Sequence, residues 1–297
     1  GDNLFANSLV AVDIKTGERQ WHHQLIHHDI WDWDNPSAPV LADLPNGRKV
    51  VMQVTKQNFV YTYDRVTGEP VWPIEEQPVP AGDVPGEWYS ATQPFPTKPA
   101  PYDRQGITED DLIDFTPELR AEALEAIKPF RLGTNLYSPP SLKSAENDPE
   151  AQVDYSMAFG VRVPRVKGLE IIKPPYGRVT AIDMNSGEHV WQAANADTPD
   201  SIANNRALEG IDVPRTGVAT RAGLLLTKTL LFVGEGVGGG TKLYAQDKQT
   251  GEIIARIELP ATQTGQPFTY EHDGKQYVAM FVSGGGRPTE LIALALP

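Results

Sequence analysis

Asp13–Glu18, written DIKTGE, is the first copy of a pattern that the chain repeats. Asp-x-x-Thr/Ser-Gly-Glu occurs four times, at 13–18 (DIKTGE), 64–69 (DRVTGE), 183–188 (DMNSGE) and 247–252 (DKQTGE). Alternating residues precede each copy, which is typical of a strand with one buried face, and a second apolar run follows. The Asp opens a turn by accepting backbone hydrogen bonds, and the Gly supplies a positive φ angle. Each copy therefore predicts a β-hairpin.

A Trp at a fixed distance from the Asp marks three of the four copies. Trp21, Trp72 and Trp191 each follow the Asp by eight residues, and the fourth copy has Ala255 there. A Trp fixed relative to a hairpin predicts a residue that packs one sheet onto the next. The four Asp residues lie 51, 119 and 64 residues apart, and a four-stranded propeller blade needs about 40–50 residues. We therefore predict an all-β fold, a partial β-propeller of about four to five blades that forms one domain over residues 1–297.

The longest spacing has a different composition and predicts an insertion at residues 73–140 within the propeller. Pro73–Pro101 is rich in proline and is typical of a long surface excursion. Thr116 is a good N-cap and Pro117 suits a first helical turn, so a helix is expected over Leu119–Ile127 and should end before Pro129. The insertion could cap one face of the propeller or form a lid over a site, and the 119-residue interval could also contain a degenerate fifth blade.

The bulk composition excludes several classes of partner and site. The formal net charge is −13, from 26 basic and 39 acidic residues, so we expect no nucleic-acid partner, because binding nucleic acid needs a basic face. Cysteine is absent, which excludes disulfides and thiolate metal sites. The chain has no initiator Met and begins within a predicted strand, Asn7–Asp13. We expect it to be a fragment of a longer protein, with any targeting or membrane segment outside it.

The stretch His27–Asp34, written HHDIWDWD, concentrates two His, two Trp and three Asp in eight residues. It follows the outgoing strand of the first hairpin, Arg19–Ile26, and so leaves a blade where propellers bind ligands. Side chains alternate along an extended segment, so Asp32 and Asp34 should share one side and the two Trp the other. Two carboxylates on one side favour a cation or a proton as their partner.

Four uses of this stretch are open from the residues alone. The pair Asp32 and Asp34 could bind a hard cation such as Ca²⁺, which takes oxygen ligands. One desolvated carboxylate could act as a general base. His27, His28 and Asp29 could bind a transition metal, although adjacent His residues in a strand face opposite ways. The stretch could also be a polar loop whose Asp residues only cap turns.

Lys56, in Val54–Asn58 (VTKQN), is a second candidate site residue. It lies just before the predicted strand Phe59–Asp64 and is flanked by apolar runs, so its ammonium group needs a partner. A quinone oxygen or a carboxylate would serve, and Asp32 is a candidate neighbour. The alternative is an ordinary exposed lysine in a hairpin turn.

Taken together, the Trp-bearing repeat, HHDIWDWD and the run TKQNFVYTYDRVTGE (55–69) resemble the pyrroloquinoline quinone (PQQ)-dependent dehydrogenases. The likeness is greatest to the quinoprotein glucose dehydrogenase branch, as a C-terminal fragment, and GQPFTYEHDGKQYV (265–278) resembles the last blade of that family. It covers residues 1–80 and 174–297 well. The resemblance implies an eight-bladed propeller that holds PQQ with Ca²⁺ or another divalent or lanthanide ion.

The resemblance also implies roles for the candidate residues. Asp32 matches the catalytic Asp and would take the proton of a substrate hydroxyl as hydride moves to metal-bound PQQ, and Lys56 matches the residue at the quinone oxygens. Asp32 and Asp34 would be metal ligands. The substrate would be a glucose-like sugar or an alcohol, and the electron acceptor a quinone or cytochrome. The protein would be periplasmic, or face the periplasm at the inner membrane.

Two other functions compete with a dehydrogenase. A non-catalytic propeller scaffold shares Trp-bearing blades, as in outer-membrane assembly lipoproteins, and an inactive relative of the dehydrogenases would keep the fold without the chemistry. The combination of HHDIWDWD with Lys56 favours the enzyme, because a scaffold needs neither.

Overall fold

The computed structural model describes residues 1–130, 132–133, 136–139 and 163–295. The chain divides into two compact units. The first comprises Gly1–Asp110, Lys128–Val163 and Asp183–Glu188, and the second comprises Asp111–Ile127, Pro164–Ile182 and His189–Pro297. That 1–297 is one propeller domain, with 73–140 inserted in it, stays a prediction.

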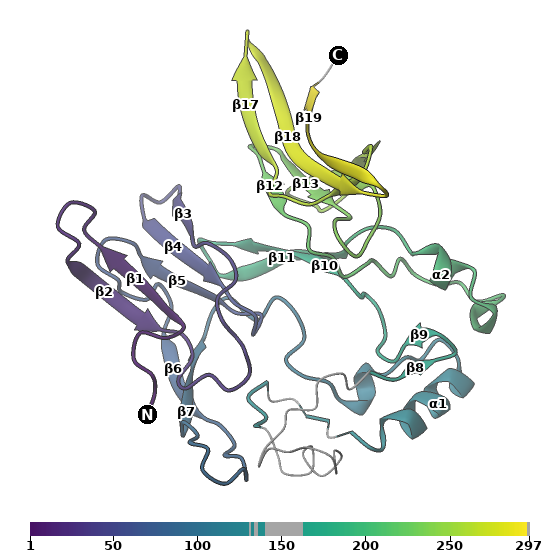
Figure 1. Ribbon diagram of the computed structural model, residues 1–297, viewed down its shortest axis with the longest axis horizontal. Helices are drawn as coiled ribbons and strands as arrows, with labels where there is room; N and C mark the ends of the chain where they lie inside the picture. The colour runs from purple at the N-terminus through teal and green to yellow at the C-terminus, as the bar shows by residue number, and fades with distance from the viewer. Residues whose placement is uncertain (131, 134–135, 140–162, 296–297) are drawn as a thin grey trace. The chain divides into compact units, whose positions relative to one another are not determined.

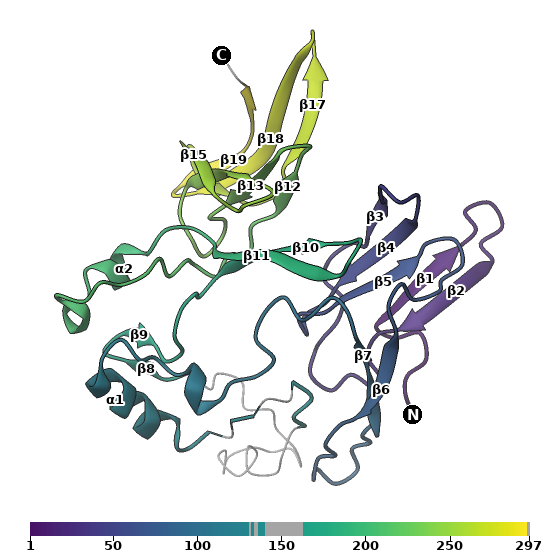
Figure 2. The same ribbon diagram turned by 180° about the vertical axis from the view of Figure 1, so that it is seen from behind.

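The first unit is built from antiparallel hairpins and one three-stranded sheet. Strands pair as β1–β2, β3–β4–β5 and β6–β7, and the first two sheets lie side by side in both views (Figures 1 and 2). The strands are β1 (Ser8–Val12), β2 (Arg19–Gln24), β3 (Val40–Asp43), β4 (Lys49–Val54), β5 (Val60–Asp64), β6 (Ile74–Pro78) and β7 (Thr92–Pro96). Leu9, Leu25, Val51, Phe59 and Tyr61 are buried in its core.

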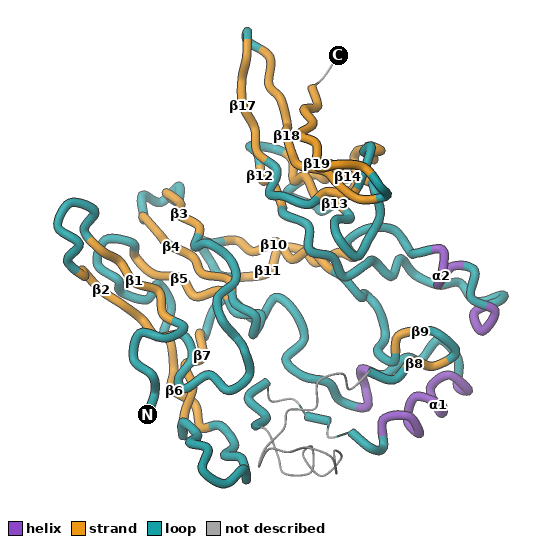
Figure 3. The backbone as a smooth tube through the Cα atoms, viewed as in Figure 1, coloured by secondary structure: helices purple, strands orange, loops and turns teal. Residues whose placement is uncertain are grey.

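The second unit contains a four-stranded sheet, β12–β13–β14–β15, as a propeller blade would have. A further sheet follows in which β16, β17 and β19 all pair with β18. The second unit includes α1 (Pro117–Ile127), β8 (Arg165–Val166), β9 (Leu169–Glu170), α2 (Asp200–Ala203), β12 (Leu224–Leu226), β13 (Leu230–Gly234), β14 (Lys242–Asp247), β15 (Ile253–Glu258), β16 (Thr262–Gln263), β17 (Phe268–His272), β18 (Lys275–Gly284) and β19 (Arg287–Ala295). The described chain consists mainly of strands and loops, with a few short helices, as expected of an all-β fold (Figure 3).

The predicted helix forms where its capping residues place it. Thr116 Oγ1 accepts a hydrogen bond from the amide of Leu119 at 3.2 Å, and α1 ends at Ile127, shortly before Pro129. Leu119 and Ala123 bury one face of α1 against Leu112 and Ile113. No helix in the described ranges is both long and apolar enough to cross a bilayer.

The first, third and fourth repeats form the predicted hairpins, between β1 and β2, between β10 (Arg178–Asp183) and β11 (Glu188–Ala194), and between β14 and β15. The second repeat forms the turn after β5, but the returning chain makes only an isolated bridge, Tyr63 to Pro70, and β6 pairs with β7. In the first, Asp13 Oδ1 accepts hydrogen bonds from the amides of Lys15 and Thr16 at 2.8 and 2.9 Å, and Gly17 has φ +74°. The strands are shorter than predicted, since β1 covers Ser8–Val12 and β2 ends at Gln24.

We expect stability to fall in acid partly through these turns. Backbone amides that donate to Asp13, Asp64 and Asp183 hold the pKa of each carboxyl below its ordinary value. A lowered folded-state pKa contributes stability above the unfolded value, about 4, and that stability is lost as pH falls through the folded value. Replacing all three by Asn, which accepts at any pH, should flatten the acid limb of the unfolding free energy measured by urea titration. An unchanged acid limb would contradict this role.

Each Trp of the repeat packs against the turn glycine of the next repeat along the chain. A Cβ placed on Gly68 would lie 2.5 Å from Trp21 Cγ, one on Gly187 would lie 2.9 Å from Trp72 Cζ2, and one on Gly251 would lie 2.7 Å from Trp191 Cε3. The predicted docking role of the Trp is therefore confirmed. Because Trp72 meets Gly187 directly, the second and third repeats are neighbours despite the long interval. A degenerate fifth blade could also lie in that interval, but residues 140–162 of it are outside the described residues.

Gly68→Ala should be more destabilising than Gly17→Ala. Both glycines have a positive φ, +78° and +74°, but no atom lies within 4 Å of a Cβ on Gly17. The control therefore carries only the backbone strain, about 1–2 kcal/mol, whereas Gly68→Ala must also displace Trp21, which adds about 1–3 kcal/mol. Urea unfolding of the two variants measures the difference. Equal losses would show that Trp docking does not require a glycine.

Candidate functional site

Asp29 organises the loop that carries HHDIWDWD, which lies in the first unit between β2 and β3. Its Oδ1 accepts from the amide of Trp31 at 2.9 Å, and its Oδ2 accepts from the amide of Trp33 at 2.7 Å and from Asn7 Nδ2 at 2.9 Å. These bonds close a tight turn, and Asp32 adopts φ +61°. The prediction of an extended segment is wrong here, because the side chain of Asp29 competes for amides that a strand would use. Asp29 does cap a turn, as one of the open alternatives supposed.

The two histidines turn to different partners. His27 Nε2 lies 3.0 Å from Glu76 Oε1 on β6, and His28 Nε2 lies 3.2 Å from Glu87 Oε1 in the loop between β6 and β7. With Asp29 engaged in its turn, the three side chains do not converge. Among the described residues there is no group of three or more His, Cys, Asp or Glu side chains that could hold a metal ion.

Trp31 and Trp33 share one side of the loop, as predicted, and stack on each other. Their ring centroids are 5.4 Å apart with an interplanar angle of 23°. Tyr137 packs edge-on against both, at 5.3 and 5.1 Å, and against Phe95 of β7 at 5.3 Å. Trp31 Nε1 also donates to the carbonyl of Ser138 at 2.8 Å. Residues 137–138, more than a hundred residues further along the chain, thus support the loop on the side of its two Trp.

Tyr137→Ala should destabilise the first unit by about 3–5 kcal/mol, because it empties a fully buried ring site between three aromatic residues. Tyr137→Phe keeps the ring and is the matched control. Urea unfolding gives the free energies, and near-ultraviolet circular dichroism reports the order of the Trp pair. An Ala variant as stable as the Phe variant would show that Tyr137 does not support the loop.

Asp32, Asp34 and Lys56 meet on the other side of the loop. Lys56, in the turn between β4 and β5, pairs with Asp34 Oδ1 and donates to the carbonyl oxygen of Asp32 at 2.8 Å. Its Nζ is 3.7 Å from Asp32 Oδ2. The predicted neighbourhood of Asp32 and Lys56 is confirmed, and the cation that the carboxylate pair receives is the lysine ammonium.

The pair of Asp34 and Lys56 is held charged, and the cluster faces solvent. The hydrogen bond from Lys56 lowers the pKa of Asp34, and the same bond raises the pKa of Lys56. The side chain of Asp32 is 95% exposed and that of Lys56 is 35% exposed. The expectation of a desolvated carboxylate is therefore wrong for the described chain, because Asp32 and Asp34 lie on a surface loop. A carboxylate open to solvent can receive a proton from a ligand that docks there, and the ammonium group can donate to an oxygen of that ligand.

The donor set fits a quinone better than it fits a metal ion by itself. An ammonium held charged beside a carboxylate suits the carbonyl oxygen of a quinone such as PQQ. A calcium ion takes six to eight oxygen ligands, of which Asp32 and Asp34 could supply some. The described residues offer no third acidic ligand there, so the metal role of Asp32 and Asp34 stays a prediction.

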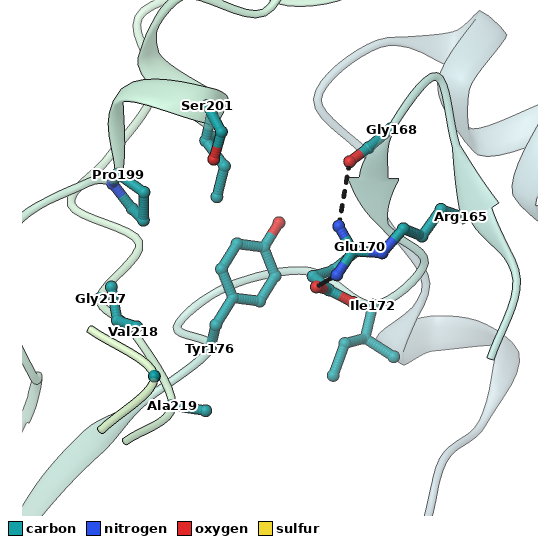
Figure 4. Close-up of a pocket in the computed structure, with 12 residues that line it drawn as sticks. Arg165, Gly168, Glu170, Ile172, Tyr176, Pro199, Ser201, Gly217, Val218 and Ala219 are labelled. Carbon is teal, nitrogen blue, oxygen red and sulfur yellow. Dashed lines mark hydrogen bonds and ion pairs between the residues drawn. The ribbon is translucent and has the colours of Figure 1, made fainter. Parts of the chain in front are cut away.

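A separate cavity of about 460 Å³ lies in the second unit. Figure 4 shows the ring of Tyr176 between Ser201 and Pro199 on one side and Glu170 with Ile172 on the other. Arg165 closes one edge by pairing with Glu170. No predicted site residue lines this cavity.

Sequence reasoning missed the residues that hold the loop in place. Glu76 and Gln93 contact His27 from 49 and 66 residues further along the chain. Tyr137 packs against the two Trp, and the carbonyl of the next residue, Ser138, is bonded to Trp31 across 107 residues. Nothing local to these residues distinguishes them. The one signal that could have identified Gln93 is its burial on a strand. Burial cannot be read from the sequence of this hairpin, which is rich in proline and lacks a clear alternation of apolar residues.

Comparison with known proteins identifies the family of this chain. The family described as glucose/ethanol/alcohol dehydrogenase, beta-propeller domain, matches residues 1–156 and 143–278. Quinoprotein glucose dehydrogenase A of Acinetobacter calcoaceticus is 28% identical over 99% of this chain and 44% of its own length. The glycerol dehydrogenase large subunit of Gluconobacter thailandicus is 27% identical over 95% of this chain and 47% of its own length.

The chain thus spans about half the length of the curated relatives it matches. Among solved structures, quinohemoprotein alcohol dehydrogenase ADHIIG from Pseudomonas putida HK5 gives a TM-score of 0.49 at 22% identity, over 96% of this chain and 40% of that chain. The family match extends over most of the sequence and includes both HHDIWDWD and Lys56. The prediction of a partial β-propeller is confirmed, and the chain belongs to the family of PQQ-dependent glucose, ethanol and alcohol dehydrogenases, as part of their β-propeller domain.

Proposed function

We propose that this chain carries the substrate-oxidising site of a PQQ-dependent dehydrogenase that acts on a CH–OH donor, a glucose-like sugar or an alcohol. One observation supports this above the others: Asp32, Asp34 and Lys56 converge within a chain that matches the PQQ family. A scaffold would not need a charged cluster on a turn that Asp29 shapes so closely.

Asp32 acts as the general base. Its carboxylate is exposed, so a donor hydroxyl can reach it, and the turn that Asp29 closes on either side of Asp32 fixes its backbone on the loop. The proton of the donor hydroxyl passes to Asp32 as the C–H bond breaks. PQQ, when bound, supplies the acceptor for the hydride that leaves carbon.

Lys56 binds the quinone oxygens. Its charge is favoured by Asp34, which raises the pKa of the ammonium group. A fixed positive charge stabilises negative charge that develops on a neighbouring oxygen. Asp32 and Asp34 supply carboxylate oxygens to a Ca²⁺ or lanthanide ion, with further ligands contributed from outside the described residues.

The remaining parts of the proposal follow the resemblance of the chain to its family. Electrons pass on to a quinone or a cytochrome, and the protein works in the periplasm or at the periplasmic face of the inner membrane.

The test is dye reduction by the full-length protein that contains this chain, reconstituted with PQQ and Ca²⁺. D-glucose, glycerol and ethanol are the first donors, and La³⁺ replaces Ca²⁺ in a parallel set. We expect turnover that requires PQQ and at least one of these donors. PQQ that binds without any turnover would point to a different donor or to an inactive relative, and the absence of both binding and turnover would favour a scaffold.

A further inference from the structure

Gln93 holds the start of the candidate catalytic loop from a neighbouring hairpin. Its side-chain Oε1 accepts from the amide of His27 at 2.9 Å, and its Nε2 donates to the carbonyl of His27 at 2.7 Å. The amide group therefore satisfies both backbone groups of one residue, as a neighbouring strand would. Gln93 is fully buried, which removes water as a competing partner for these two bonds.

The side chain of His27 is bound to the same hairpin. His27 Nε2 lies 3.0 Å from Glu76 Oε1, and the other carboxylate oxygen of Glu76 accepts from Thr92 Oγ1 at 2.7 Å. Thr92 and Gln93 are adjacent on β7, and Glu76 is on β6. His27 is thus fixed through its backbone and its ring by two paired strands.

The hairpin is anchored independently of this contact. The hydroxyl of the buried Tyr61 donates to the carbonyl of Pro94 at 2.7 Å, and Phe95 packs against Phe59 at 5.7 Å. These contacts, with Tyr61 on β5 and with Phe59 just before it, keep β7 in place when the Gln93 amide is removed. A change at Gln93 can therefore loosen His27 without detaching the hairpin.

A displacement of His27 passes directly to the charged cluster. Asp29 is two residues further on, and its three hydrogen bonds make residues 29–33 a rigid turn. Asp32 lies within that turn and Asp34 follows it, and both meet Lys56, which belongs to a different sheet. Asn7 and the segment of Tyr137 and Ser138 hold the turn itself, and His27 holds the backbone that leads into it.

We propose that Gln93 is a positioning residue that fixes Asp32 and Asp34 against Lys56 by clamping the backbone of His27. This inference rests on the proposed function and extends it to a residue that touches neither substrate nor cofactor. The β6–β7 hairpin, which lies within the predicted insertion, then serves to support the site.

The experiment compares Gln93→Met with Gln77→Met in the full-length protein. Methionine has a similar volume and removes both hydrogen bonds to His27. Gln77 is the cross-strand partner of Gln93 on β6 and is exposed, so the same substitution there controls for composition and strand propensity. Gln93→Asn is the second variant, used as well if the Met variant does not fold, because the shorter amide cannot reach both backbone groups.

Two readouts are taken. The first is hydrogen exchange of the His27 amide in protein without PQQ, which should accelerate about tenfold or more in the Gln93 variants and stay unchanged in Gln77→Met. The second is turnover with saturating PQQ, in which kcat should fall about 10- to 100-fold while KM for the donor changes less than about threefold.

The two readouts separate the inference from the proposed function. Unchanged exchange in both Gln93 variants overturns the clamp. Faster exchange with unchanged kcat overturns positioning, because Gln93 would then serve the fold alone. If the wild-type protein shows no PQQ-dependent turnover, the proposed function fails, and the exchange of the His27 amide still decides whether Gln93 holds the loop.

Discussion

Asp32→Asn is expected to lower kcat about 10²- to 10⁴-fold, the usual contribution of a general base. The amide has the shape of the carboxylate but cannot take a proton. Asn also tolerates the positive φ of +61° at this position, so the loop should keep its conformation. Folding, measured by urea unfolding, and PQQ affinity, measured by equilibrium dialysis, should be nearly unchanged.

Asp273→Asn is the matched control for this variant. Asp273 also has a positive φ, +50°, and its side chain is 91% exposed, close to the 95% of Asp32. The control should retain full turnover. Wild-type kcat in Asp32→Asn would remove Asp32 from the mechanism and leave Asp34 as the remaining carboxylate of the cluster.

Lys56→Met is expected to lower kcat about 10²- to 10³-fold at saturating PQQ, as the loss of one charged donor at a developing oxyanion does. Methionine keeps most of the length of the side chain and removes its charge. The change also leaves Asp34 without its partner and the carbonyl of Asp32 without its donor. Steady-state dye reduction with rising PQQ separates the loss of turnover from weaker binding.

Lys228→Met controls for the loss of one positive charge at an exposed position. It should behave as the wild type. If Lys56→Met also behaves as the wild type in kcat and in PQQ dependence, Lys56 is an ordinary turn lysine whose contacts with Asp32 and Asp34 are surface ion pairs, which contribute little.

The hairpins and their docking contacts were predictable because their chemistry is local. An Asp that accepts from amides two and three residues ahead, with a Gly at positive φ, forms the same turn in any surroundings. The regular position of the Trp relative to this turn then implied a repeated contact, and Trp21 against Gly68 shows it.

The loop itself was predictable only in part. Alternation placed Trp31 and Trp33 together, and the need of the Lys56 ammonium for a partner pointed to Asp32, but the turn at Asp29 was mistaken for extended chain. Its conformation depends on side-chain hydrogen bonds that compete with strand pairing. Tyr137 and Gln93 could not be predicted, because their contacts join segments far apart in the sequence and depend on burial.

The central claim is that the cluster around Lys56 forms part of a PQQ site, and equilibrium dialysis of PQQ against the full-length protein tests it most directly. With Ca²⁺ present, we predict saturable binding of one PQQ per chain, weakened about 10- to 100-fold by Lys56→Met, as loss of a charge-assisted hydrogen bond implies, and unchanged by Lys228→Met. Binding of equal affinity in the wild-type and Lys56→Met proteins, or no saturable binding with either Ca²⁺ or La³⁺, would contradict it.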